Sequence, residues 1–478
     1  MARVRPTIYV AAAQAGAEGL GLVRNVLLAR ALGPSEMGVA VALTMTLSLL
    51  DMISDFGPDR LLVQAEDGDR EEFQSTAHSM LIIRGLFSAV LLAGLALPVG
   101  YYLNRPDAVG MMVALGVVPL VRGLLHLDSK RVQRHHDFHR TMIVELSAAI
   151  TATAAAFLLA PWMRSAAVLV WVSVLQTVVL VGVSHGVAQR PYRLGMGRDV
   201  AGRLLRFGWP LAINGVIMFG AFQGDRLVVL ASATAADLGR YAVAFQMTMV
   251  PALLISRIAS TAWLPSLARC QGDPVTFDQR LESITKILGG VGLVFSLGIL
   301  TLGNPVIKML YGPEFPVPVA VMSALGVMQG LRILRAVPSL AALSRADSFN
   351  PLASNVLRFL GIAAAAVAGM SGGGLEAITA CGCGGEVMAL IGSIGLLRHR
   401  HSLSVKPLIR VSGLFAIGLL SAGVATQAVD WPLAGRLVLA VVALLTLVQM
   451  GWGLVRQRFA AMVHHEPGRC PALVKTGN

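Results

Sequence analysis

Residues 30–38 read RALGPSEMG, and this stretch separates two long apolar runs near residues 8–31 and 37–63. Proline removes a main-chain donor and glycine tolerates unusual backbone angles, so the pair interrupts a helix. Each run has roughly the 20 residues that a helix needs to cross the apolar core of a bilayer, about 30 Å thick. The stretch therefore predicts a tight turn between two membrane-spanning helices.

A similar turn recurs 201 residues further along the chain. The shift places residues 35–38 (SEMG) over residues 236–239 (ADLG), and Arg24 over Asp225. Six spans separate the copies, so both halves enter the membrane in the same sense. Such repeats are related by a pseudo-two-fold axis along the membrane normal.

Apolar runs of this kind fill the chain. Hydrophobic residues make up 55% of the 478 residues and charged residues 14%, whereas soluble domains carry about 25% charged residues. The sequence predicts an all-α integral membrane protein with about 14 transmembrane helices. They form two six-helix lobes, at residues 1–200 (spans 1–6) and 201–397 (spans 7–12). Residues 398–478 hold two extra C-terminal helices and a cytoplasmic tail.

The predicted spans lie near residues 8–31, 37–63, 74–101, 108–127, 141–161, 165–186, 209–231, 237–263, 284–306, 317–343, 351–371, 374–397, 409–428 and 431–454.

Basic residues in the connections predict the orientation, because Lys and Arg near span ends stay cytoplasmic. If the amino terminus is inside, the outside connections carry only Arg105, Arg164 and Lys308. We therefore expect both termini in the cytoplasm. The net charge of +13 then reflects topology and contact with anionic lipids, and no nucleic-acid partner is expected.

Arginines within the predicted spans are the strongest functional signal. A charge at the bilayer centre costs about 2.5–3.5 kcal/mol on insertion scales, so deep arginines are expected to face a watery cleft or a partner. A guanidinium donates two parallel hydrogen bonds to a phosphate, which predicts an anion-binding cleft between the lobes. The alternative is that each arginine pairs with an acid and only holds helices together. The candidate cleft residues are Arg24, Arg84, Arg122, Arg257, Arg332, Arg335 and Arg358.

Three acids are candidates for gating or ion coupling. Asp225 aligns with Arg24 across the repeat, which suggests an outer gate pair. Asp55 and Glu145 are candidates for proton coupling if burial raises their pKa, and structural pairing with a basic neighbour is the alternative. The four cysteines have no recurring spacing, and we predict neither a metal nor a cofactor.

Four stretches carry a resemblance to a known family: residues 30–38, residues 55–64 (DFGPDRLLVQ), the basic loop at 133–145, and residues 238–241 (LGRY) after Asp225-Arg226. In order and spacing they resemble the multidrug, oligosaccharidyl-lipid and polysaccharide exporter superfamily. Within it the chain is most similar to the polysaccharide transporters, also called O-antigen or oligosaccharide flippases.

The resemblance implies a transporter and not an enzyme. Such proteins move an undecaprenyl-pyrophosphate-linked oligosaccharide from the cytoplasmic to the periplasmic leaflet of the bacterial inner membrane, for assembly of O-antigen, capsule or exopolysaccharide. The expected mechanism is alternating access of two lobes. The implied partners are the lipid-linked oligosaccharide, membrane lipids and polysaccharide assembly proteins.

Two other functions remain open at this stage. A multidrug or cation antiporter of the same superfamily needs acids in its cleft, and the excess of arginines argues against it. A membrane polysaccharide polymerase or glycosyltransferase usually needs a large loop to host its chemistry, whereas the expected outside connections are short.

Overall fold

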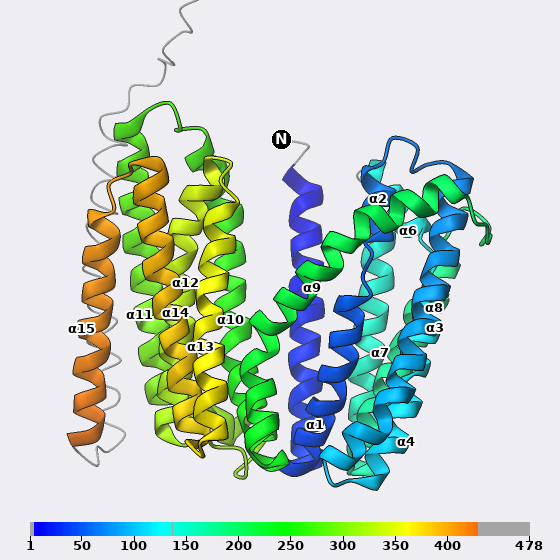
Figure 1. Cartoon of the computed structure of the whole chain (residues 1–478), viewed down its shortest axis with the longest axis horizontal. Coiled ribbons are helices and arrows are strands. Elements are labelled where there is room, and N and C mark those ends of the chain that lie inside the picture. The colour runs from blue at the N-terminus through cyan, green and yellow to red at the C-terminus, as the bar shows by residue number, and fades with distance from the viewer. Residues whose placement is uncertain (1–3, 136, 429–478) are drawn as a thin grey trace, which may run out of the picture. The chain divides into compact units, whose positions relative to one another are not determined.

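The computed structural model describes residues 4–135 and 137–428, and the side chains of residues 16–135 and 137–417. Within this part of the chain every regular element is a helix (Figure 1). Among the described residues, ten helices are long and apolar enough to cross a membrane. The predicted all-α class is therefore confirmed.

The helices are α1 (Val4–Ile53), α2 (Pro58–Gln64), α3 (Glu71–Tyr102), α4 (Pro106–Leu115), α5 (Val117–Arg122), α6 (Asp128–Arg131), the 3-10 helix η1 (Val132–His135), α7 (His139–Met163), α8 (Ala167–Gly186), α9 (Arg198–Ser232), α10 (Ala235–Ala268), α11 (Pro274–Tyr311), α12 (Val319–Ser344), α13 (Phe349–Met370), α14 (Gly374–His401) and α15 (Lys406–Ala428).

These helices follow the predicted spans closely. The apolar segment Gly16–Gln64 contains the first two spans, and a helix break at Gly33, with φ of 71°, separates them. The short helices α4 and α5 share the fourth span, and α15 covers the thirteenth. The fourteenth, at 431–454, lies outside the described residues.

The chain divides into two compact units. The first unit holds the described residues up to Met247, with Gly303–Met322 and Arg358–Gly385. The second holds Thr248–Leu302, Ser323–Leu357 and the described residues from Glu386. The lobe boundaries predicted at residues 200 and 397 stay a prediction.

Within the first unit, the two turns of the repeat contact each other reciprocally. A Cβ atom on Gly38 would lie 1.7 Å from the carbonyl oxygen of Ala235, and one on Gly239 would lie 2.0 Å from that of Pro34. Pro34 and Ala235 are equivalent under the 201-residue shift, as are the two glycines. A two-fold axis produces contacts of this exchanged form. Glycine is required at both positions because no side chain fits.

The predicted second span, 37–63, is not one continuous helix. α1 ends at Ile53, residues 54–57 are not helical, and α2 begins at Pro58. The cause is local, because Gly57 is left-handed with φ of 60° and proline is favoured at the first position of a new helix. Non-helical backbone at membrane depth is tolerated where it lines a cavity.

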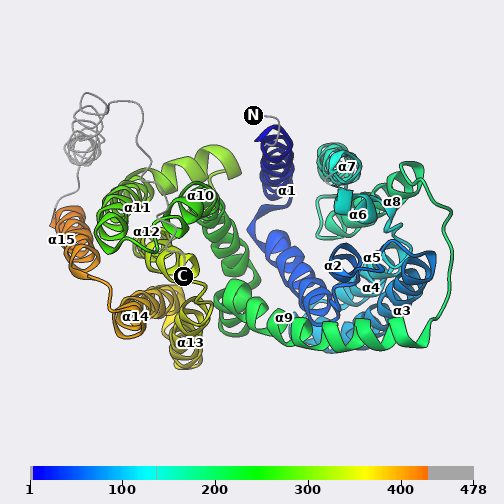
Figure 2. The ribbon, with the colours of Figure 1, turned by 90° about the horizontal axis from the view of Figure 1, so that it is seen from above.

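Helix α9 packs against this break. It begins at Arg198, eleven residues before the predicted span, and contacts α1, α2 and α3 (Figure 2). A Cβ atom on Gly208 would lie 2.5 Å from the Cβ atom of Phe56, and one on Gly215 would lie 2.1 Å from the carbonyl oxygen of Met52. The two glycines are seven residues apart and share a helix face. They let α9 approach the broken segment closely.

Candidate functional site

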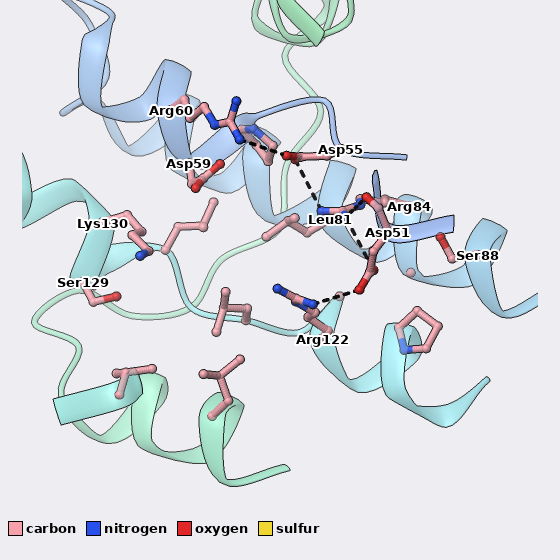
Figure 3. Close-up of a pocket in the computed structure, with 18 of the residues that line it drawn as sticks. Asp51, Asp55, Asp59, Arg60, Leu81, Arg84, Ser88, Arg122, Ser129 and Lys130 are labelled. Atoms are coloured by element: carbon pink, nitrogen blue, oxygen red, sulfur yellow. Dashed lines mark hydrogen bonds and ion pairs between the residues drawn. The ribbon is translucent and has the colours of Figure 1, made fainter. Parts of the chain in front are cut away.

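A cavity of about 590 Å³ lies in the first unit, beside the break between α1 and α2 (Figure 3). Residues from α1, α2, α3, α5, α6, α7 and α8 line it together with residues of the connections. Its size falls in the range of small-molecule sites. Its charged lining residues are four acids and four bases: Asp51, Asp55, Asp59 and Glu145, and Arg60, Arg84, Arg122 and Lys130.

Arg84, on α3, binds the broken end of α1. Its Nε donates to Ser54 Oγ at 3.0 Å, and its Nη2 donates to the carbonyl oxygen of Asp51 at 2.8 Å. The last carbonyl groups of a helix lack partners within the helix and carry partial negative charge. A guanidinium at this end satisfies one of them.

Two aspartates four residues apart extend this contact into a chain of ion pairs. Asp51 lies between Arg84, at 3.6 Å, and Arg122, at 3.0 Å. Asp55 lies between Arg84, at 3.7 Å, and Arg60, at 3.4 Å, and also accepts the Gly57 N–H at 3.1 Å. We call these five side chains the ion chain: Arg60, Asp55, Arg84, Asp51 and Arg122 (Figure 3). Its three cations and two anions leave one net positive charge.

A separate ion pair lies on another part of the cavity wall. Lys130 donates from Nζ to Glu145 Oε1 at 3.0 Å, and Glu145 is 45% exposed. The predicted role of Glu145 in ion coupling stays a prediction.

The structure thus brings four predicted site residues into one cavity, namely Arg84, Arg122, Asp55 and Glu145. Asp51, Arg60 and Lys130 were not among the candidates. The spacing of Asp51 and Asp55 was a usable signal, because residues four apart lie on one face of the continuous helix predicted there. In the structure Asp55 lies just past the end of α1.

Two other predicted arginines gather in the second unit. Arg332 donates from Nε and Nη2 to Glu386 Oε1, at 2.9 and 2.6 Å, and from Nη1 to Gln329 Oε1 at 3.1 Å. Arg335 lies 3.3 Å from Glu386 Oε2 and donates to Ser354 and Asn355. We call Arg332, Arg335 and Glu386 the buried triad, because Glu386 is inaccessible and Arg332 is 9% exposed.

The remaining candidates lie apart from the cavity lining. Arg24 donates to Gln176 Oε1 at 2.9 Å, and the buried Arg358 donates to the carbonyl oxygen of Ala221. Asp225 is buried on α9, and Arg257 is exposed on α10. Their predicted roles in binding and gating stay predictions.

The turn after α2 lies outside the membrane-spanning helices and carries the acids of a second ionic network. Asp67 accepts two hydrogen bonds from Arg203, at 2.8 and 2.7 Å, and Asp69 accepts one from Arg131 at 2.8 Å. These bonds hold the pKa of each carboxyl below its ordinary value. They tie this turn to the start of α9 and to α6.

Solved structures identify the class of fold. The chain superposes on the lipid II flippase MurJ, in an inward closed conformation, with a TM-score of 0.72 at 13% identity, covering 95% of this chain and 100% of that one. It superposes on an inward-facing MATE-family multidrug resistance transporter with a TM-score of 0.64 at 15% identity, covering 82% and 95%. At this identity the likeness shows the fold that the chain shares with these two transporters.

Sequence comparison identifies the family. Residues 27–320 match the family described as polysaccharide biosynthesis protein, and the chain belongs to this family. It is 22% identical over 318 residues to the lipopolysaccharide biosynthesis protein WzxC of Escherichia coli strain K12. It is 20% identical over 321 residues to an uncharacterized membrane protein of the cps region of Klebsiella pneumoniae. The predicted resemblance to the polysaccharide transporter branch is confirmed.

The matches to both relatives cover 66% of this chain, but 64% and 65% of the relatives' own lengths. The apolar helices together with the family make the chain a multi-pass protein of the bacterial inner membrane. The matched family segment contains the whole lining of the cavity.

Proposed function

We propose that this protein is a flippase, not an enzyme, that moves an undecaprenyl-pyrophosphate-linked oligosaccharide from the cytoplasmic to the periplasmic leaflet. Alternating access of two lobes would carry the substrate, for assembly of O-antigen, capsule or exopolysaccharide. The family, the fold shared with MurJ and the name of WzxC support this proposal. Polysaccharide assembly proteins and membrane lipids are the partners that we propose.

The observation that carries the proposal is the pair of guanidinium groups of Arg84 and Arg122 around one carboxylate in a cavity of the first unit. A diphosphate presents several anionic oxygens, and one guanidinium group can bind two such oxygens at once. The cavity therefore has the chemistry to bind the diphosphate. The sugars differ among members of this branch, so we propose that this cavity binds the diphosphate part of the substrate.

The place of the cavity fits loading from the cytoplasmic leaflet. Its lining includes Ser129 and Lys130, in a basic connection that the charge rule assigns to the cytoplasm. With both termini in the cytoplasm, as we propose, the cavity lies toward that side of the first unit. Asp55 and Glu145 remain our candidates for ion coupling.

The test is export in bacteria that carry this gene in place of their own flippase gene. We expect Arg84→Gln and Arg122→Gln each to lower the periplasmic exposure of the lipid-linked glycan at least about tenfold, because each removes a charge-assisted contact. Arg164→Gln, a change in an expected outside connection, is the control. Unchanged export by both cavity variants, at equal protein levels in the membrane, would contradict the proposal.

A cation antiporter of the same superfamily is the second candidate. The observation that favours it is the equal number of acids and bases in the cavity lining. Asp51→Asn and Asp55→Asn would then abolish efflux of organic cations, whereas a flippase would show no such efflux. Efflux of ethidium from cells that express the protein distinguishes the two functions.

A further inference from the structure

We propose that Asp51 is a positioning residue for transport, whose carboxylate holds Arg84 and Arg122 before the substrate binds and competes with the substrate diphosphate for them. The inference rests on the proposed function of the cavity. Asp51, which was not among the candidates from the sequence, would then allow bound diphosphate to be released.

The Asp51 carboxylate lies between two guanidinium groups. Its Oδ1 lies 3.6 Å from Arg84 Nη2, and its Oδ2 lies 3.0 Å from Arg122 Nη1 (Figure 3). One carboxylate therefore uses its two oxygens on two guanidinium groups. A phosphate group would present oxygens of the same kind to the same donors. Carboxylate and phosphate cannot both occupy these N–H groups.

The two arginines are not held equally firmly. Arg84 is 17% exposed and keeps its bonds to Ser54 Oγ and to the main-chain carbonyl of Asp51 when the carboxylate leaves. Arg122 is 50% exposed, and its hydrogen bond in the structure goes to the Asp51 carboxylate. We infer that Arg84 stays fixed as the anchor and that Arg122 moves with the phosphate that it binds.

The rate of transport depends on how tightly the substrate is bound. A transport site must bind strongly enough to load and weakly enough to release. The Asp51 carboxylate lowers the affinity for the diphosphate, and it pairs with the two arginines again when the diphosphate is released. Without the Asp51 carboxylate, the rest of the ion chain would hold the diphosphate more tightly and release it more slowly.

The experiment measures binding and transport of the same protein. Undecaprenyl diphosphate is titrated into the full chain in lipid nanodiscs, with inorganic pyrophosphate as competitor, and translocation of a fluorescent undecaprenyl diphosphate is followed in proteoliposomes. We expect Asp51→Asn to bind undecaprenyl diphosphate about tenfold tighter and to translocate it several times more slowly. Loss of a purely structural contact would not tighten binding.

Two control variants separate exchange from a general change of charge. Asp199→Asn removes an exposed carboxylate at the start of α9, outside the cavity lining, and should change affinity less than about twofold. Asp51→Glu keeps the charge and should remain close to the wild type. Equal tightening in Asp199→Asn or in Asp51→Glu would overturn the proposal.

A third comparison tests the dependence on Arg122. In an Arg122→Gln background, Asp51→Asn should tighten binding much less, because the released guanidinium is gone. Full tightening without Arg122, or no tightening with it, overturns the role of Asp51 while leaving the flippase intact. If the wild type does not bind undecaprenyl diphosphate at all, both the proposed function and this inference fail.

Discussion

The ion chain and the buried triad use the same residue types in opposite ways. In the first unit, Arg84 and Arg122 meet aspartates at distances of 3.0 to 3.7 Å on the wall of a cavity. In the second unit, Arg332 meets Glu386 at 2.6 Å, and neither residue lines that cavity. A short, buried ion pair is costly to separate, whereas a half-exposed pair exchanges readily with water or a ligand.

This difference shows how the role of an arginine within a membrane span can be inferred. The presence of an arginine in a span fits both alternatives given by the sequence, namely a contact with substrate and a structural ion pair. Exposure and the number of hydrogen bonds decide between them. Arg332 directs three N–H groups at Glu386 and Gln329, so it has little capacity left for an anion. Its predicted contact with substrate stays a prediction.

The largest expected effect is on the buried triad. Glu386→Gln would leave Arg332 and Arg335 buried side by side without their carboxylate, and should destabilise the protein by about 3–5 kcal/mol. Glu145→Gln, the matched change in the cavity, should cost under about 1 kcal/mol because its pair with Lys130 is partly exposed. Thermal unfolding in detergent measures both. Similar losses for the two variants would remove the distinction between the two regions.

An intermediate effect is expected where glycine shapes the cavity. A Cβ atom on Gly85 would lie 2.4 Å from the carbonyl oxygen of Pro119, so Gly85→Ala must push α3 and α5 apart, at about 1–3 kcal/mol. Because α5 carries Arg122, export should fall as well. Gly94→Ala on the same helix is the control, since nothing lies within 4 Å of its added Cβ atom. Full export by Gly85→Ala would show that the cavity tolerates a shift of α5.

The smallest effect is expected at the turn after α2, and it depends on pH. The hydrogen bonds from Arg203 hold the pKa of Asp67 below its ordinary value of about 3.9. A carboxyl with a lowered pKa stabilises the fold above its ordinary pKa, and this contribution is lost as pH falls through the folded pKa. The melting temperature of Asp67→Asn should therefore lie slightly below that of the wild type at pH 7, with the gap closing below about pH 4. A gap that widens in acid would contradict this assignment.

The helices were predictable because the membrane imposes their length and composition. The runs at 74–101 and 141–161 correspond to α3 (Glu71–Tyr102) and α7 (His139–Met163), within a few residues. The repeat was also visible, and the contacts of Gly38 and Gly239 support it. The break at residues 54–57 was missed, because an apolar run gives no sign of where hydrogen bonds stop. Gly57-Pro58 was the available local signal.

The partners of each arginine were not predictable in the same way. Arg84 and Arg332 both stand in apolar helices, and nothing near them in sequence separates their roles. Their partners come from elsewhere in the chain, from Asp51 and Asp55 on one side and from Glu386 on the other. Ion pairs between helices depend on helix rotation and crossing, which the packing of all the helices sets.

The sequence by itself determined that the chain is a bundle of membrane-spanning helices built on a repeat. Lipid offers backbone groups no hydrogen bonds, so apolar length alone specifies a helix. Only the tertiary structure decided that Asp51 and Asp55 lie between Arg60, Arg84 and Arg122 on a cavity wall, while Arg332 and Arg335 enclose Glu386. The reason is that the strength of an ion pair depends on distance and exposure, and both are set by packing between residues far apart in the chain.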